Sequence, residues 1–286
     1  MEFTKVHGTG NDFVLVDCRH ETIKDFSAAA KEMCQRHFGI GADGLLAVLS
    51  PKEVDNNYQM RIFNSDGSEA EMCGNGIRCF AHYLVNNNLT EKEELRIETK
   101  AGIIKPRIIS TKESKSQVQV NIGQPRFKPK QVPINIEESD LDFVDNYKIE
   151  VSGKEFTISC VSMGNPHTVI FVDTLEEVKL RKWGPTLETA DLFPENTNVE
   201  FIEVAASDRI KMKVWERGVG VTLACGTGAC GAAVVGIKKG LLEKEVTVEL
   251  PGGELLISWS GTKEAPVKMT GPAETVFVGE YKGINL

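Results

Sequence analysis

The hydrophobic pattern of the chain is mainly that of β-strands. Apolar residues alternate with polar ones, or form short runs, between clusters of Gly, Asn, Pro and Ser, and this pattern is typical of strands. Helical spacing predicts helices only at 27–36, 74–86 and 226–239. Residues 124–150 contain prolines and are weakly periodic, so they are the predicted linker. The predicted strands are 13–17, 44–49, 58–63, 95–99, 103–109, 116–122, 156–163, 168–173, 199–204, 209–216, 245–250, 254–259 and 274–280.

The chain also contains an internal repeat. Residues 60–79 (MRIFNSDGSEAEMCGNGIRC) match residues 212–230 (MKVWERGVGVTLACGTGAC), with Cys73 aligned to Cys225 at an offset of 152, which is 225 minus 73. Each copy places a strand, a loop and then Cys-Gly-x-Gly at the start of a helix. We therefore predict two copies of one unit of about 150 residues. Two related halves commonly form one site at their interface.

Composition and charge exclude several classes of protein. The 286 residues include 33 Lys+Arg and 41 Asp+Glu, giving a net charge of -8, whereas a nucleic-acid partner would need clustered basic residues. No run of about 18 apolar residues is present, so no membrane span is expected. The first residues lack a signal-peptide pattern, and the 7 cysteines are an odd number, so we expect a reduced, cytoplasmic protein. The cysteines expected only to pack are Cys18, Cys34, Cys79, Cys160 and Cys230.

The two Cys-Gly-x-Gly elements suggest acid–base chemistry. The unpaired N–H groups at a helix start carry partial positive charge, and we expect them to lower the pKa of a thiol and to bind a carboxylate. One thiolate could remove a proton from one face of an sp³ carbon while the opposing thiol protonates the other face. The N–H groups would stabilise the charge that spreads onto the substrate carboxylate. Such an inversion needs neither a cofactor nor a metal.

Six motifs together resemble the diaminopimelate epimerase family: GTGNDF (8–13), MCGNGIRC (72–79), GNPH (164–167), NTNVEF (196–201), WERGVG (215–220) and ACGTGACG (224–231). The resemblance implies an α+β fold of two pseudo-symmetric halves, each a mixed or antiparallel β-sheet wrapped barrel-like around a central helix, with the active site in the cleft between them. It places the halves at 1–122 with a returning segment 273–286, and at 123–272. It also implies a homodimer that interconverts LL- and meso-diaminopimelate without pyridoxal phosphate, in lysine and peptidoglycan synthesis.

The resemblance also implies roles for individual residues. Cys73 and Cys225 would be the acid–base pair, and His167 and Glu216 would tune the thiols. Arg217 is suited to a substrate carboxylate, because its planar guanidinium can bind one bidentately. The residues expected to bind the amino acid substrate are Asn11, Asn64, Gly74, Asn75, Asn165, Asn198, Glu216, Arg217, Gly226 and Thr227.

Two alternatives and one departure remain. Proline racemases and hydroxyproline epimerases also use two cysteines, but they carry His where this chain has Asn75. Residues 226–231 match the G-x-G-x-x-G dinucleotide fingerprint, although the first copy has Cys79 in place of the third glycine. Many family members carry a substrate-contacting Gln at the position of Gly44, so that contact is expected to be lost or replaced by water.

Overall fold

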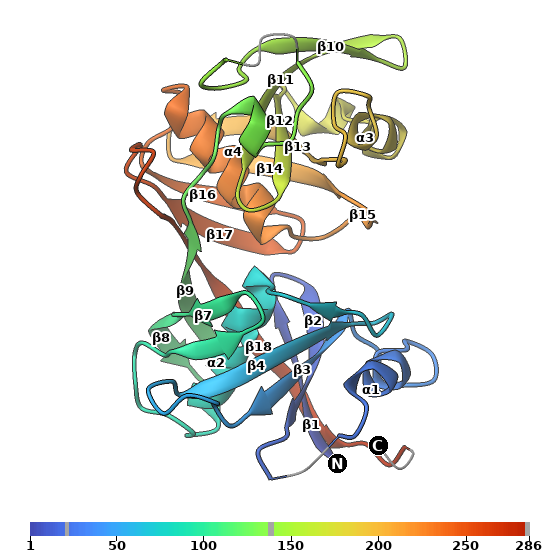
Figure 1. Cartoon of the computed structure of the whole chain (residues 1–286), viewed down its shortest axis with the longest axis vertical. Coiled ribbons are helices and arrows are strands. Elements are labelled where there is room, and N and C mark those ends of the chain that lie inside the picture. Colours follow the sequence, from blue (N-terminus) through green and yellow to red (C-terminus); the bar gives the residue numbers. More distant parts are fainter. Residues whose placement is uncertain (21–22, 137–139, 284–286) are drawn as a thin grey trace. The chain divides into compact units, whose positions relative to one another are not determined.

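The chain forms two compact units. The computed structural model describes residues 1–20, 23–136 and 140–283. Unit 1 comprises Met1–Asn121 and Thr270–Leu286, and unit 2 comprises Ile122–Met269. Figure 1 shows unit 1 in blue to green with the red C-terminal strand β18 (Val267–Glu280), and unit 2 in green through yellow to red-orange. Within the part of the chain that the structure describes, no helix is both long and apolar enough to cross a membrane.

Unit 1 is a sheet with helix α2 (Gly74–Asn86) against it and the shorter helix α1 (Phe26–Met33) beside it. In chain order β1 is antiparallel to β2, β2 is parallel to β3, and β3 is antiparallel to β4. After α2 the chain returns in β6, parallel to β4. The strands of this unit are β1 (Glu2–Gly8), β2 (Asn11–Asp17), β3 (Gly44–Leu49), β4 (Tyr58–Asn64), β5 (Glu69–Ala70), β6 (Ile97–Thr99), β7 (Gly102–Ile104), β8 (Arg107–Lys112), β9 (Lys115–Gly123) and β18 (Val267–Glu280).

Unit 2 repeats this order around helix α4 (Gly226–Lys238), with α3 (Leu180–Glu188) in the place of α1. Here β11 is antiparallel to β12, β12 is parallel to β13, and β13 is antiparallel to β14. After α4 the chain returns in β16, parallel to β14. The strands of this unit are β10 (Tyr147–Val151), β11 (Lys154–Ser162), β12 (Pro166–Phe171), β13 (Asn198–Ala206), β14 (Arg209–Glu216), β15 (Gly220–Val221), β16 (Glu245–Leu250) and β17 (Gly253–Ser258). The predicted α+β fold of two repeated halves is confirmed.

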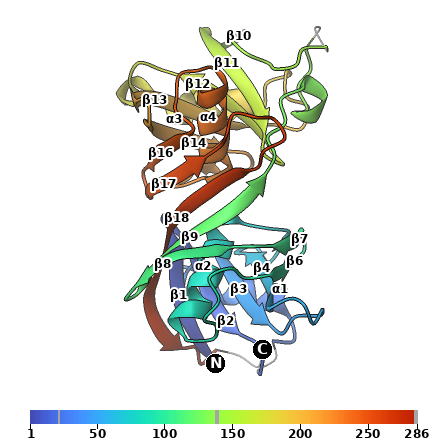
Figure 2. The ribbon, with the colours of Figure 1, turned by 90° about the vertical axis from the view of Figure 1, so that its left-hand side faces the viewer.

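The two long helices are the centres of their units. Helix α2 contacts β1, β2, β3, β4 and β8, and α4 contacts strands from β11 to β17, so strands lie around each helix (Figures 1 and 2). Helix α4 is buried at every position from Gly228 to Gly236. A helix that is apolar all round belongs in a core, and burial of this surface is the main source of its stability.

The prediction that residues 124–150 form a linker is wrong. Residues 124–150 pack into unit 2, where Phe127 joins the apolar cluster around α4 and Val132 and Val144 join the cluster beside α3. The segment includes the 3₁₀ turn Pro129–Gln131 and runs into β10, while 137–139 lie outside the described residues. Apolar side chains spaced irregularly along an extended segment can still be buried, and periodicity alone does not detect them.

Other elements also depart from the sequence prediction, among them β1, α3 and the strand predicted at 103–109. Strand β1 and helix α3 were not predicted, and α3 contains Gly184 and Pro185, which lower helix propensity. Trp183, which is buried in the apolar cluster of unit 2, fixes α3 in place. The strand predicted at 103–109 is interrupted before Pro106 and forms β7 and β8, because proline cannot donate to a central ladder.

Candidate active site

Cys73 and Cys225 cap the two central helices. Each has an extended backbone at the N-cap position, and its sulfur accepts from the third helical residue: Gly76 N–H lies 3.4 Å from Cys73 Sγ, and Gly228 N–H lies 3.4 Å from Cys225 Sγ. The predicted position of each cysteine at a helix start is therefore observed. The sulfur lies where unpaired N–H groups and the helix dipole favour negative charge.

Asn11 and Asn75 lie beside Cys73 in unit 1. The Cys73 thiol donates to Asn11 Oδ1 over 3.7 Å, and Asn75 Nδ2 donates to the same oxygen over 3.2 Å. Asn11 Nδ2 in turn donates to Asp43 Oδ2 over 2.8 Å. Since a carboxylate only accepts, Asp43 fixes the amide so that its oxygen faces the thiol. Asp43 was not among the predicted site residues.

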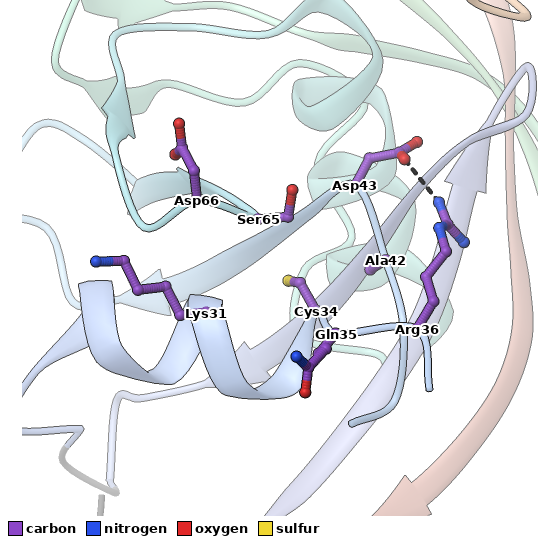
Figure 3. A pocket seen from close by; sticks show the side chains of 8 residues that line it. All are labelled: Lys31, Cys34, Gln35, Arg36, Ala42, Asp43, Ser65 and Asp66. Carbon is purple, nitrogen blue, oxygen red and sulfur yellow. Dashed lines mark hydrogen bonds and ion pairs between the residues drawn. The ribbon is translucent and has the colours of Figure 1, made fainter. Parts of the chain in front are cut away.

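An open cavity of about 490 Å³ lies on the outer side of Asp43. Figure 3 shows the Arg36 guanidinium pointing at Asp43, and the two groups are 2.7 Å apart. None of the residues predicted to bind substrate lines this cavity. Arg36 therefore supports Asp43, and through it Asn11, from outside the site.

Arg78 is a second residue that the sequence analysis missed. It lies on α2 and is fully buried. Its guanidinium donates to Gly74 O over 3.2 Å, to Thr9 Oγ1 over 3.1 Å and to Pro272 O over 3.3 Å. These contacts hold the start of α2 against the β1–β2 turn and β18. The only sequence signal is a charged residue within an otherwise apolar helix.

Asn64 and Gly44 lie opposite each other on β4 and β3. The Asn64 amide is exposed and donates to Ser68 Oγ over 2.9 Å. At Gly44 an added Cβ would lie 2.7 Å from the carbonyl oxygen of Phe63, a distance that requires the backbone to shift. A residue with a side chain at position 44 would therefore need a shift of β3 or β4.

In unit 2, Cys225 lies close to two carboxyl groups. Burial raises the pKa of Cys225 well above its ordinary value, and the charges of Glu216 and Glu200 raise it further, against the hydrogen bonds from Thr227 and the Gly228 N–H. The Gly228 N–H at the helix start lowers the pKa of Cys225 as expected, but burial and the charges of Glu216 and Glu200 outweigh it, so the net direction is upward.

Glu216 is the carboxyl group that bonds directly with Cys225. Burial raises the pKa of Glu216, although hydrogen bonds from Thr222 and Cys225 oppose the shift. Thr222 Oγ1 donates to Glu216 Oε1. Glu216 and Cys225 therefore influence each other's ionisation, since the charge of Glu216 raises the pKa of Cys225 and the hydrogen bond from Cys225 lowers that of Glu216.

His167, Asn165 and Thr227 form a chain of polar groups that leads to Cys225. His167 Nδ1 lies 2.7 Å from Glu200 Oε1, and its Nε2 lies 3.1 Å from Asn165 Oδ1. Asn165 Nδ2 donates to Thr227 Oγ1 over 3.3 Å, and Thr227 Oγ1 lies 3.6 Å from Cys225 Sγ. Glu200 was missed by the sequence analysis; its only signal is one charged residue in the apolar stretch of β13.

Asn198 and Arg217 are joined through the backbone. Asn198 Oδ1 accepts from the Arg217 N–H over 3.0 Å, and Asn198 Nδ2 donates to Pro166 O over 2.8 Å. The half-buried Arg217 side chain donates to Glu195 O over 3.0 Å. Both ends of the Asn198 amide are thus used to shape the turn that carries Arg217.

The remaining cysteines are in apolar surroundings or at the edge of them. Cys34, Cys79, Cys160 and Cys230 are buried, and Cys18 is half-buried. Burial raises the pKa of Cys34 to about 12 and that of Cys160 to about 12. A buried thiol with a raised pKa is inert as an acid–base group at neutral pH.

The sequence and the fold both have relatives among known proteins. A family model described as diaminopimelate epimerase matches residues 3–128 and 159–276. A diaminopimelate epimerase of Halothermothrix orenii is 55% identical over 98% of this chain and 97% of its own length. That of Carboxydothermus hydrogenoformans is 50% identical over 98% and 99%.

Solved structures extend the likeness of fold. A phenazine biosynthesis protein of Bacillus anthracis has a TM-score of 0.70 at 20% identity, covering 98% of each chain. A probable proline racemase of Agrobacterium radiobacter has a TM-score of 0.67 at 13% identity, covering 98% of this chain and 92% of its own. At these identities the likeness concerns the fold alone.

Proposed function

Because this chain belongs to the diaminopimelate epimerase family, we propose that it inverts one α-carbon of LL-2,6-diaminopimelate to give the meso isomer, and catalyses the reverse reaction. The protein is an isomerase. The product serves lysine and peptidoglycan synthesis, and we place the enzyme in the cytoplasm. The observation that carries the proposal is the pair of cysteines that cap the two central helices.

The proposed reaction uses Cys73 and Cys225 on opposite faces of one α-carbon. One thiolate takes the α-proton: an S–H bond forms, the C–H bond breaks, and its electron pair spreads onto the α-carboxylate. The other thiol then gives its proton to the opposite face and becomes the thiolate. Protons balance, no redox change occurs, and the chemistry requires both units to present their cysteines to the same carbon.

We assign the α-carboxylate to the helix starts. Gly74 and Asn75 in unit 1, and Gly226 and Thr227 in unit 2, are the first residues after the capping cysteines. Their N–H groups are not used within the helix. Donors fixed in advance stabilise the charge that develops on the carboxylate oxygens as the proton leaves.

The thiols and the distal end of the substrate need further groups. Glu216 would tune the Cys225 thiol, which is supported by the hydrogen bond between the two groups and by the effect of the Glu216 charge on Cys225. His167 would tune the same thiol through Asn165. The distal ammonium and carboxylate would be bound by Arg217 and by amides, since an amide offers both donors and an acceptor. The amides are those of Asn11, Asn64, Asn165 and Asn198.

The proposal is tested by proton exchange on a panel of substrates. Purified protein in deuterated water is incubated with LL-diaminopimelate, L-proline, hydroxyproline or L-glutamate and followed by NMR. We expect deuterium at the α-carbon of the inverted product with diaminopimelate alone. Inversion of proline or hydroxyproline instead would assign the protein to the alternative two-cysteine racemases, and inversion without exchange would contradict the two-base mechanism.

Alanine variants test the two cysteines individually. Cys73→Ala and Cys225→Ala are each expected to abolish epimerisation while the circular dichroism spectrum stays that of the native fold. The half-buried Cys18 offers a matched control, and Cys18→Ala should keep full activity. Epimerisation of LL-diaminopimelate by either site variant would contradict the assignment.

We further propose that the protein is a homodimer. The support in unit 1 is an exposed run of three apolar residues on β18, Val276, Phe277 and Val278. Exposed apolar runs on a strand are surfaces that a soluble protein tends to cover.

A further inference from the structure

Glu200 is a buried carboxylate on the inner face of a core strand. Along β13, Val199 and Phe201 join the apolar cluster beside α3, whereas Ile202 joins the cluster around α4. By alternation Glu200 faces α4 with Ile202. Glu200 and His167 are both 0% exposed. The pair lies against the first turns of the helix that Cys225 caps.

Two glycines of α4 make room for this pair. A Cβ at Gly228 would lie 2.7 Å from Glu200 Oε1, and a Cβ at Gly231 would lie 3.3 Å from the His167 Cβ. These glycines belong to the G-x-G-x-x-G sequence that matched a dinucleotide fingerprint. Their spacing is thus explained by the close approach of a charged pair to the helix.

The other copy of the repeat shows that the fold does not need such a pair. Gly76 is the counterpart of Gly228 at the offset of 152, which is 228 minus 76. The three atoms nearest to a Cβ there carry no charge: Ile62 Cδ1 at 3.2 Å, Cys73 Cβ at 3.4 Å and Leu46 Cδ2 at 3.4 Å. A buried pair of charges is seldom more stabilising than apolar packing, so its presence in unit 2 alone points to a role in function.

The hydrogen bonds define where the protons lie. Asn165 Nδ2 donates to Thr227, so Asn165 Oδ1 is the atom that faces His167 Nε2; the amide orientation is assigned from these contacts. An amide oxygen only accepts, hence Nε2 carries a proton. Nδ1 faces Glu200 Oε1 at 2.7 Å, the length of a charge-assisted bond.

We propose that Glu200 is a positioning residue that holds His167 as an imidazolium. The imidazolium donates to Asn165, and Asn165 donates to Thr227. The Thr227 hydroxyl proton is then free to donate to Cys225 Sγ. A hydroxyl that donates to sulfur favours the thiolate. The charge of Glu200 raises the pKa of Cys225, and the imidazolium would oppose that charge. The inference rests on the proposed function, in which Cys225 alternates between thiol and thiolate.

Three other titratable groups act on this pair and on its neighbours. Glu216 on β14 and Cys225 at the start of α4 interact electrostatically with His167 or Glu200. Cys160 on β11 is affected by the charge of Glu200. Glu216 is the group that would compete for the imidazolium, since it is an acid on a neighbouring strand. A test must therefore observe His167 itself.

The direct test is the ¹⁵N spectrum of the histidine rings in the full-length protein. The chain has 5 histidines, and a His167→Asn variant identifies the signal. Near neutral pH we expect both nitrogens of His167 to be protonated in the wild type. In Glu200→Gln, which keeps the volume and removes the charge, one nitrogen should lose its proton. An unprotonated nitrogen in the wild type, or an unchanged signal in the variant, would overturn the inference.

Kinetics supply the second readout. Glu200→Gln should lower kcat by about ten- to a hundredfold, the rate equivalent of one charged hydrogen bond, with little change in KM. Glu203→Gln is the matched control, since Glu203 lies on the same strand but bonds Leu175 N and Lys211; it should keep wild-type kcat. A fall in thermal stability without a fall in kcat would show a merely structural role and contradict the inference.

The two hypotheses fail separately. If the wild type shows no exchange with diaminopimelate, the proposed function is contradicted. The ring spectrum of His167 can still be measured in that case. An active wild type with a neutral His167 contradicts only the role of Glu200. The wild-type spectrum decides the protonation state even if Glu200→Gln does not fold.

Discussion

Cysteine is an unusual residue with which to begin a helix. Serine, threonine, aspartate and asparagine are the preferred N-caps, yet Cys73 and Cys225 hold that position in both units and accept from a glycine N–H over 3.4 Å. A thiol is a weaker acceptor than a hydroxyl oxygen. Helix stability alone would therefore favour serine, and the presence of sulfur at both caps supports the proposed acid–base role of the two cysteines.

Serine variants separate the cap from the chemistry. Cys73→Ser and Cys225→Ser keep an acceptor for the glycine N–H, so each should unfold at the same or a higher urea concentration than the wild type, with a gain of up to about 0.5 kcal/mol. Epimerisation should fall by at least about a hundredfold, because a hydroxyl does not ionise near neutral pH. Loss of stability in the serine variants would mean that the sulfur stabilises the fold by packing more than a hydroxyl does by capping the helix.

Glu216 should make the protein less stable as pH rises. Burial raises its pKa in the folded state above the ordinary 4.5, so its contribution to stability is complete below that value and is lost as pH rises through the folded pKa. Glu216→Gln mimics the protonated form. We expect the variant to unfold at higher urea than the wild type at about pH 8, and to lose this advantage at about pH 4.

The same substitution should lower the rate of epimerisation, because an amide lacks the charge by which Glu216 would tune Cys225. The pH series is its own control, since only an ionisable group produces a difference that changes with pH. A constant difference in stability across the pH range would contradict the buried, ionisable role of Glu216.

At the scale of elements, helix α2 is held at its start by Arg78. The buried guanidinium joins Gly74, Thr9 and Pro272, which belong to the helix, the β1–β2 turn and β18. Arg78→Met leaves three polar groups without this donor. We expect the free energy of unfolding to fall by about 3 kcal/mol, and activity to fall with the loss of a fixed position for Cys73.

Arg107→Met is the matched control for Arg78. Arg107 is paired with Glu93 at 3.6 Å on the surface, with more than half of each side chain exposed, and an exposed pair contributes little. Its loss should change the free energy of unfolding by less than about 0.5 kcal/mol. Equal effects of the two variants in urea unfolding would show that burial of Arg78 is not what makes it important.

The elements that sequence patterning predicted are those with a regular apolar period. Helices α2 and α4 and the central strands of both units were found because one face or all faces are apolar over a long stretch. Helix α3 was missed because glycine and proline weaken its local propensity, and packing of Trp183 overrides that weakness. The segment 124–150 was taken for a linker because its buried side chains, such as Phe127 and Val144, follow no period.

The residues of the candidate site also fall into those that the sequence predicted and those that it did not. The Cys-Gly-x-Gly repeat identified both cysteines and the helix starts, because duplication makes a short motif specific. Glu200, Asp43 and Arg78 were not found, since each acts through a partner far away in the sequence: Glu200 through His167, Asp43 through Asn11. A single sequence without its fold contains no signal for such pairs.

At the scale of the whole molecule, the two units share the order and direction of their strands, whereas the side chains around the two cysteines differ. Both units run through the same order of antiparallel and parallel strand pairs, and both place a cysteine at the start of a 13-residue helix. The polar groups around the cysteines differ: amides and Asp43 in unit 1, carboxyl groups and His167 in unit 2. This difference matches a reaction in which each thiol serves one stereoisomer.

The assembly of the molecule is the last prediction. Val276, Phe277 and Val278 follow one another on β18 and are exposed by 54%, 47% and 65%, and Phe277 packs edge-on against Phe3 at 5.8 Å. Because successive strand residues point to opposite faces, both faces of this strand are apolar at the surface. A second copy of the chain would cover them, and sedimentation should then give about twice the chain mass of 31.5 kDa.

Phe277→Glu places a charge in the middle of that surface and should yield a monomer at micromolar concentration, because a dimer would have to bury an unpaired carboxylate. Val54→Glu is the control, since Val54 is 99% exposed in the same unit and should leave the dimer intact. A wild type that sediments as a monomer contradicts the homodimer. A Phe277→Glu variant that still dimerises, with its circular dichroism unchanged, would place the interface elsewhere on the molecule.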